Sequence, residues 1–100
     1  MGNRQIKLSD SAFSDLGNIE NYIAEDSPTV AQKFIQRIFE RIEQLYDYPE
    51  SGKVVDEFRN TKIRELVLKR YRIIYEIMSS NELIILRVIH GSRILDLDVD

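Results

Sequence analysis

The sequence has no cysteine and only one histidine among its 100 residues. Disulfide scaffolds, thiol catalysis and cysteine zinc sites are therefore excluded, and so is a histidine-rich metal site. The four glycines are too scattered to form a phosphate-binding loop, and no G-x-S-x-G nucleophile motif is present. We therefore expect no metal and no cofactor.

Long apolar runs are also missing. No stretch approaches the roughly 20 residues of a membrane span, and residues 1–5 lack the apolar core of a signal peptide. Hydrophobic residues make up 43% of the chain and charged residues 31%, a composition typical of a globular protein. We expect a single cytoplasmic domain spanning residues 1–100 that does not bind a membrane.

The net charge of −3 conceals an uneven distribution. Residues 1–58 have 6 Lys and Arg against 11 acids, whereas residues 59–93 have 8 against 3, a local charge of +5. Residues 94–100 add 3 acids. A stretch such as 59–93 meets phosphate groups or an acidic partner, although Lys and Arg more often simply keep exposed strand faces soluble.

The apolar pattern of the first half predicts a strand and two helices. Alternation of polar and apolar residues favours a strand over about residues 4–8. Ser9 offers an N-cap for a helix over about residues 10–25, and Ser27, with proline after it, offers one for a helix over about residues 28–47. The short connection between these helices favours an antiparallel helical hairpin.

The spacing of apolar residues changes from a helical to a strand-like period after a loop that contains proline and glycine. Strands are predicted over about residues 62–68, 71–78 and 83–90, with residues 53–55 as a short strand or extended arm. Their close spacing favours consecutive antiparallel pairing. The predicted fold is α+β with the order β-α-α-β-β-β, in which the helical hairpin packs on one face of a small antiparallel sheet. The other face is free to stay open, and the arginines of the strands are available to line it.

Bulky apolar side chains of the two helices exceed what one helical layer on a small sheet encloses. They are Phe13, Tyr22, Phe34, Phe39 and Tyr46. A small domain buries only about 60–65% of its unfolded-chain surface. Some of these side chains are therefore expected to line a groove beside the hairpin, and exposed apolar patches mark partner sites.

The remaining polar site candidates are basic. They are Arg64, Lys69, Arg70, Arg72, Arg87, His90 and Arg93. An arginine inside an apolar strand needs a partner, because an unpaired buried guanidinium is costly. Arg72 therefore has the alternative of a structural ion pair with Glu65 or Glu76, and Arg87 has a similar alternative.

His90 and Arg93 place an imidazole and a guanidinium within four residues at the end of a strand. Such a pair suits a phosphodiester site, with the histidine carrying a proton and the arginine on the phosphate. A lone histidine at a strand end is, however, more often a hydrogen-bonded structural residue.

Three runs of the second half resemble the RelE/ParE toxin superfamily. They are Ile-Arg-Glu-Leu at 63–66, Tyr-Arg-Ile-Ile-Tyr-Glu-Ile at 71–77 and Val-Ile-His-Gly-Ser-Arg at 88–93. The helical region and the loop at 45–52 fit the same family, so the resemblance covers nearly the whole chain. It implies the growth-arresting toxin of a type II toxin–antitoxin module of the plasmid-stabilisation type. A cognate antitoxin would hold it inactive, and a toxin–antitoxin heterotetramer is one assembly that the resemblance implies.

The resemblance leaves two target classes. ParE-like members poison DNA gyrase, whereas RelE-like members enter the ribosome and cut mRNA. Arg72 and Arg93 match phosphate-contacting arginines of RelE-like enzymes, and His90 matches a base of some relatives. The lysine pair and the C-terminal tyrosine of RelE itself are not matched.

The patterns Arg-Glu-Leu at 64–66 and His-Gly-x-Arg at 90–93 are common among ParE-like sequences, so a ParE-like gyrase inhibitor is favoured. Arg64, Lys69, Arg70 and Arg87 are then expected to bind the target or a partner. The alternative is a ribosome-dependent mRNA endoribonuclease whose catalytic residues are Arg72, His90 and Arg93. A second alternative is a non-toxic family member that only binds antitoxin.

Overall fold

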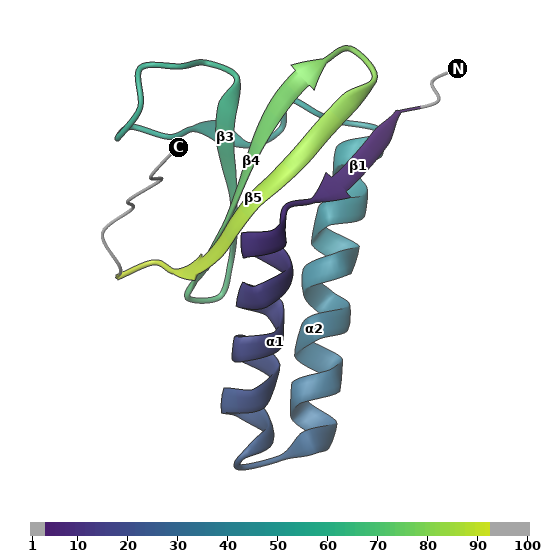
Figure 1. The fold of residues 1–100 in the computed structure, drawn as a ribbon, viewed down its shortest axis with the longest axis vertical. Helices are drawn as coiled ribbons and strands as arrows, with labels where there is room; N and C mark the ends of the chain where they lie inside the picture. The colour runs from purple at the N-terminus through teal and green to yellow at the C-terminus, as the bar shows by residue number, and fades with distance from the viewer. Residues whose placement is uncertain (1–3, 93–100) are drawn as a thin grey trace.

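The computed structural model describes residues 4–92 and shows two helices packed against a five-stranded sheet (Figure 1). In chain order the elements are β1 (Gln5–Leu8), α1 (Asp10–Ala24), α2 (Pro28–Glu43), the 3-10 helix η1 (Gln44–Tyr46), β2 (Lys53–Val54), β3 (Ile63–Leu68), β4 (Tyr71–Ser79) and β5 (Glu82–His90). The predicted α+β class is confirmed. The second helix ends as an α-helix at Glu43, and a 3-10 turn continues it to Tyr46.

Both helices begin at the predicted serine caps. The Ser9 hydroxyl accepts a hydrogen bond from the Ala12 N–H at 3.0 Å and donates one to the Leu86 carbonyl at 2.8 Å. The Ser27 hydroxyl accepts from the Val30 N–H at 3.2 Å, with proline at the first helical position. Each cap satisfies a backbone donor that the helix leaves unpaired, and the first also ties α1 to β5.

The sheet has the order β1-β5-β4-β3-β2. Strands β3, β4 and β5 form the predicted antiparallel meander. The sequence did not indicate which strand pairs with β1. The structure places β1 parallel to β5, with Gln5 opposite Glu82 and Leu8 opposite Ile85. The sheet is therefore mixed at one edge. A parallel pair needs a long crossover, and α1 and α2 lie within the connection.

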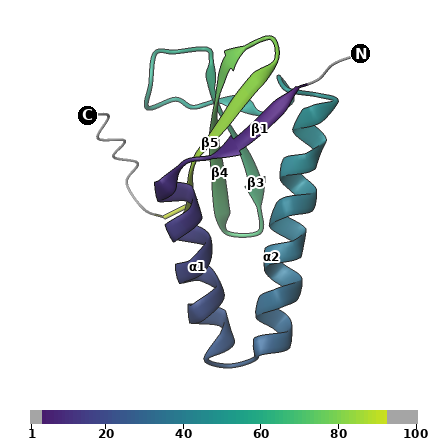
Figure 2. The ribbon, with the colours of Figure 1, turned by 45° about the vertical axis from the view of Figure 1, so that its right-hand side comes forward.

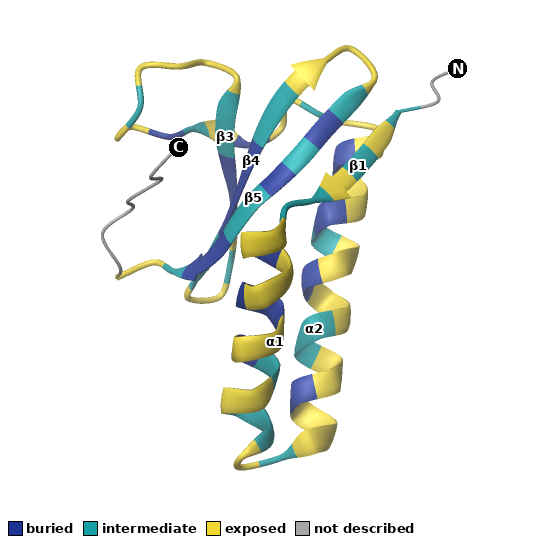
Figure 3. Cartoon of the chain, viewed as in Figure 1, coloured by how far each residue is buried: buried dark blue, intermediate teal, exposed yellow. Residues whose placement is uncertain are grey.

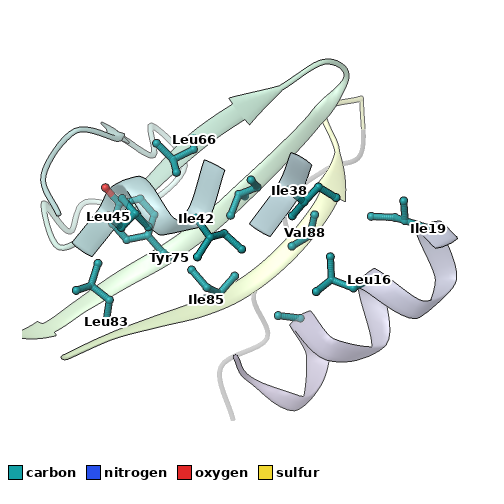
Figure 4. Close-up of a cluster of buried hydrophobic side chains, with 12 residues drawn as sticks. Leu16, Ile19, Ile38, Ile42, Leu45, Leu66, Tyr75, Leu83, Ile85 and Val88 are labelled. Carbon is teal, nitrogen blue, oxygen red and sulfur yellow. The ribbon is translucent and has the colours of Figure 1, made fainter. Parts of the chain in front are cut away.

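The main core lies between the helices and one face of the sheet (Figures 3 and 4). Ile38 and Ile42 of α2 pack there with Ile73 and Tyr75 of β4 and with side chains of α1 and β5. This arrangement confirms that the hairpin covers one face. Burial of each large apolar side chain stabilises the fold by about 1.5–3 kcal/mol.

The second sheet face, which the sequence left free to stay open, is partly covered. The segment between β2 and β3 folds over part of it and inserts Val55, which is fully buried against Ile74 and Ile89. Phe58 packs against the same small cluster. Arg72 lies two residues before Ile74 on β4 and therefore shares this covered face.

The helical hairpin extends well beyond the sheet (Figures 1 and 2). Phe13 and Tyr22 are 71% and 72% exposed, and Phe39 and Tyr46 are 42% and 45% exposed. The expectation that one helical layer leaves bulky side chains exposed is confirmed. Among residues 4–92, no helix is long and apolar enough to span a membrane.

Candidate functional site

A groove of about 930 Å³ lies where the projecting hairpin meets the β3–β4 turn and the end of β5. In the view of Figure 2, the ribbon of this turn is drawn between those of α1 and α2, and in Figure 1 it is drawn beside α1. Its apolar and aromatic lining comes from Tyr22, Ile23, Val30, Phe34 and Tyr71. Its other lining residues are Arg37, Lys69, Arg70 and His90. We call this hollow the basic groove.

The floor of the basic groove is aromatic. The rings of Phe34 and Tyr71 lie 5.5 Å apart between centroids, and those of Tyr71 and His90 meet edge-on at 5.6 Å. These separations lie in the range of favourable aromatic contacts. The three rings link α2, β4 and β5 and give the groove a fixed inner surface.

The rim of the basic groove is cationic. Arg37, Lys69 and Arg70 are exposed, and the lining residues that the structure describes include no acid. Within the described part of the chain, none of the three takes part in an ion pair. Unpaired cations beside an apolar floor favour a ligand with both anionic and apolar groups.

Lys69 and Arg70 are held at the rim by a tight turn. Leu68 and Tyr71 pair directly across β3 and β4, so only these two residues connect the strands. Lys69 has a φ of 57°, in the left-handed region, and the Arg70 carbonyl accepts from the Gly91 N–H at 2.7 Å. The turn is thus fixed to the end of β5.

His90 lies in the basic groove. Its Nδ1 accepts from the Ser92 N–H at 3.2 Å and lies 2.7 Å from the Ser92 hydroxyl. The ring also packs against Tyr71. These contacts fix the imidazole plane.

Arg72 forms the ion pair that the sequence offered as its alternative role. Its Nε donates to Glu65, and its two terminal nitrogens donate to Glu57 at 3.0 and 3.2 Å. These bonds raise the pKa of Arg72, and the Arg72 guanidinium lowers the pKa of Glu57. Glu65 was one of the partners considered, whereas Glu57 reaches Arg72 from the covering segment and was missed. The Nε side and the terminal side of the Arg72 guanidinium are therefore each bound by a carboxylate.

The structure does not bring Arg72 and His90 together. Tyr71 lies opposite His90, and Arg72 lies opposite Ile89. Because side chains alternate along a strand, His90 points with Tyr71 to the helical face and Arg72 points with Ile89 to the other. Arg93, the third residue of the proposed catalytic set, lies outside the described residues.

Arg87 and Arg64 also have structural contacts. Arg87 donates from Nε and a terminal nitrogen to the two carboxylate oxygens of Asp15 at 2.8 and 3.0 Å, which raises the pKa of Arg87. Arg64 donates to the carbonyls of Glu50 and Gly52 at 3.1 and 3.0 Å and so fixes the loop before β2. Of the four predicted binding residues, only Lys69 and Arg70 lie at the basic groove.

Arg37 is the rim residue that the sequence analysis missed. It belongs to the acidic first half of the chain, where one of two arginines on α2 gave no signal. Its place beside the β3–β4 turn depends on tertiary packing. Among residues 4–92, no cluster of three or more His, Asp or Glu is arranged to hold a metal ion.

Comparisons with known proteins agree with this fold. Residues 6–95 match a family model described as the ParE toxin of the type II toxin–antitoxin system parDE. The toxin RelE2 of Caulobacter vibrioides is 30% identical over 83% of this chain and 90% of its own. A putative toxin, Y4kP, of Sinorhizobium fredii is 32% identical over 93% of this chain and 94% of its own.

Two solved structures share the fold. One is described as a chromosomal ParDE toxin–antitoxin system from P. aeruginosa, with a TM-score of 0.70 and 23% identity over 87% of this chain and 95% of that one. The other is the toxin–antitoxin complex RelBE2 from Mycobacterium tuberculosis, with a TM-score of 0.58 and 21% identity over 87% of this chain and 96% of that one. The matched fold and the family model covering residues 6–95 show that this chain belongs to the ParE/RelE family and is the toxin of a type II toxin–antitoxin system.

Proposed function

We propose that this toxin arrests growth by inhibiting DNA gyrase in the cytoplasm, and that a cognate antitoxin neutralises it. The observation that carries the proposal is the separation of Arg72 from His90 on opposite sheet faces. A ribonuclease needs its proton carrier and its phosphate-binding cation at one phosphate, within hydrogen-bond reach of the reacting atoms. The match to a ParE toxin model supports the same choice.

The pairing of Arg72 adds to this argument. A guanidinium that donates to Glu65 and Glu57 has to give up those bonds before it binds a phosphate. Glu65 is buried, so leaving it unpaired costs several kcal/mol. Arg72 therefore serves the fold, and the exposed cations Lys69 and Arg70 are the better candidates for contact with a target or a partner.

The antitoxin is proposed to cover the hairpin and the basic groove. Structures similar to this fold are described as toxin–antitoxin systems, and an acidic partner suits the local charge of +5 over residues 59–93. A partner that binds only the folded toxin raises its melting temperature by mass action. A melting temperature unchanged by saturating antitoxin would count against this part of the proposal.

A supercoiling assay tests the target. Purified toxin at micromolar concentration is expected to block supercoiling of relaxed plasmid by gyrase. The double variant K69N/R70Q is expected to inhibit at least about tenfold less well, since loss of about 1.4 kcal/mol of binding corresponds to a factor of ten. The matched control R59Q/K62N removes two exposed charges of the same basic stretch away from the groove. Supercoiling that proceeds normally with wild-type toxin would refute gyrase as the target.

Two further outcomes separate the alternatives. Primer extension on mRNA from toxin-expressing cells would show new ends inside reading frames if the toxin were a ribosome-dependent nuclease. Induction without growth arrest would instead identify a non-toxic member that only binds antitoxin. Under the gyrase proposal, we expect replication to stop first and mRNA ends to stay unchanged.

A further inference from the structure

The basic groove leaves apolar surface and unpaired charge exposed side by side. Tyr22 and Val30 are well exposed at its mouth. Arg37, Lys69 and Arg70 stand at its rim, and none of the three forms an ion pair with another residue of the described chain. Contiguous apolar surface of this kind is normally covered. A fitting occupant carries apolar side chains together with negative charge.

The sequence beyond the described residues has this composition. Residues 94–100 read Ile-Leu-Asp-Leu-Asp-Val-Asp, with three acids and no cation. From Leu95 onward, apolar and acidic residues alternate. A period of two places apolar side chains on one side of an extended chain and carboxylates on the other. The segment is thus complementary to the groove in both polarity and charge.

The described chain ends at the groove. His90 lines it, and the Gly91 N–H donates to the Arg70 carbonyl at the rim. Seven extended residues span at most about 25 Å, whereas α2 rises only about 10 Å from Val30 to Arg37. Residues 94–100 are therefore long enough to cross the groove without any change in the described fold.

We propose that residues 94–100 of this chain dock in its own basic groove, with their apolar side chains on the aromatic floor and their aspartates against Arg37, Lys69 and Arg70. A short connection gives an attached segment an effective concentration in the millimolar range. The chain's own segment therefore outcompetes the same segment of a second copy. Any partner of the groove then has to displace it, so the segment weakens partner binding.

Spin labelling of the full chain tests this proposal. The protein has no cysteine, so the variant D100C carries a single label. In ¹⁵N spectra, the label is expected to broaden the amides of Phe34, Lys69 and Arg70, and adding D96N/D98N is expected to abolish most of that broadening. The control E40Q/E43Q removes two exposed acids of α2 and is expected to leave it unchanged.

Two results would overturn the proposal. Broadening of the groove amides that D96N/D98N leaves unchanged would mean that charge complementarity does not hold the segment. Broadening that appears when labelled, unenriched chain is mixed with unlabelled ¹⁵N chain would assign the groove to the segment of a second copy. The test involves neither gyrase nor antitoxin, so its failure leaves the proposed function untouched.

Discussion

Asp15 of α1 accepts the backbone N–H of Val88 in β5, with 2.9 Å between Oδ2 and the nitrogen. Strand β1 ends its pairing with β5 at Ile85, so this edge of β5 has no neighbouring strand beyond that residue among residues 4–92. The Asp15 carboxylate accepts the hydrogen bond that a neighbouring strand would otherwise accept. It also accepts two hydrogen bonds from Arg87. One buried acid thus fixes the helix to the sheet and satisfies a strand edge.

Replacing Asp15 is therefore expected to destabilise the fold. D15A leaves the Val88 N–H and the Arg87 guanidinium without their acceptor and is expected to lower the free energy of unfolding by about 3 kcal/mol. D15N keeps an acceptor oxygen for Val88 and is expected to cost less. Urea unfolding measures both, with the exposed D26N as control. Equal losses for D15A and D15N would contradict the role of the backbone bond.

Arg72 is expected to behave as a structural residue. R72Q leaves the buried carboxylate of Glu65 without its charged partner, so we expect a loss of about 2–4 kcal/mol in the free energy of unfolding. E57Q removes a more exposed partner and is expected to cost under about 1 kcal/mol. Urea unfolding measures both. A variant R72Q of unchanged stability but lost toxicity would instead indicate a phosphate-binding role.

The elements were predictable because their signals are local. Ser9 and Ser27 each precede a helical apolar period, and the alternation along 71–77 places Tyr71, Ile73 and Tyr75 on one face. The parallel pairing of β1 was not predictable, because it joins residues 5–8 to residues 82–85 and no turn connects them.

The site was predicted only in part because it is assembled from distant elements. Arg37 of α2 lines the same groove as Lys69 and Arg70 of the β3–β4 turn, and nothing in the sequence around Arg37 indicates this. Asp15 did carry a signal that was not used. It stands at i+3 from Ala12, with Leu16 next to it, on the apolar stripe of α1, where an acid needs a buried partner.

The backbone of Lys69 has a left-handed conformation, and its effect on stability can be measured separately from the charge of the side chain. Its φ of 57° suits glycine or asparagine better than lysine. K69G is therefore expected to raise the free energy of unfolding by about 0.5–1 kcal/mol, and K69V to lower it by about 1–2 kcal/mol. Thermal unfolding measures both, with K62G as control at a position of negative φ. If K69G destabilises the protein as much as K62G does, the turn does not hold Lys69 in this conformation.

The Tyr75 hydroxyl fixes the loop before β2 to the sheet. It donates to the Pro49 carbonyl at 2.7 Å and accepts from the Gly52 N–H at 3.0 Å. Gly52 sits so close that a Cβ there would lie 2.8 Å from the Glu65 carbonyl. Y75F leaves the buried Gly52 N–H without an acceptor, so we expect a loss of about 1–3 kcal/mol in the free energy of unfolding. Urea unfolding of Y75F at neutral pH measures it, and the exposed Y48F is the control.

Tyr75 also predicts a pH dependence at the alkaline end. Burial raises the pKa of Tyr75 above its usual value near 10, so the folded state holds this proton more tightly than the unfolded state. The resulting stabilisation is complete below about pH 10 and is lost as the pH rises through the folded-state pKa. The urea midpoint of the wild type is therefore expected to fall as the pH rises above about 10, and that of Y75F to fall less. Parallel profiles for the two proteins would show that other groups cause the alkaline loss.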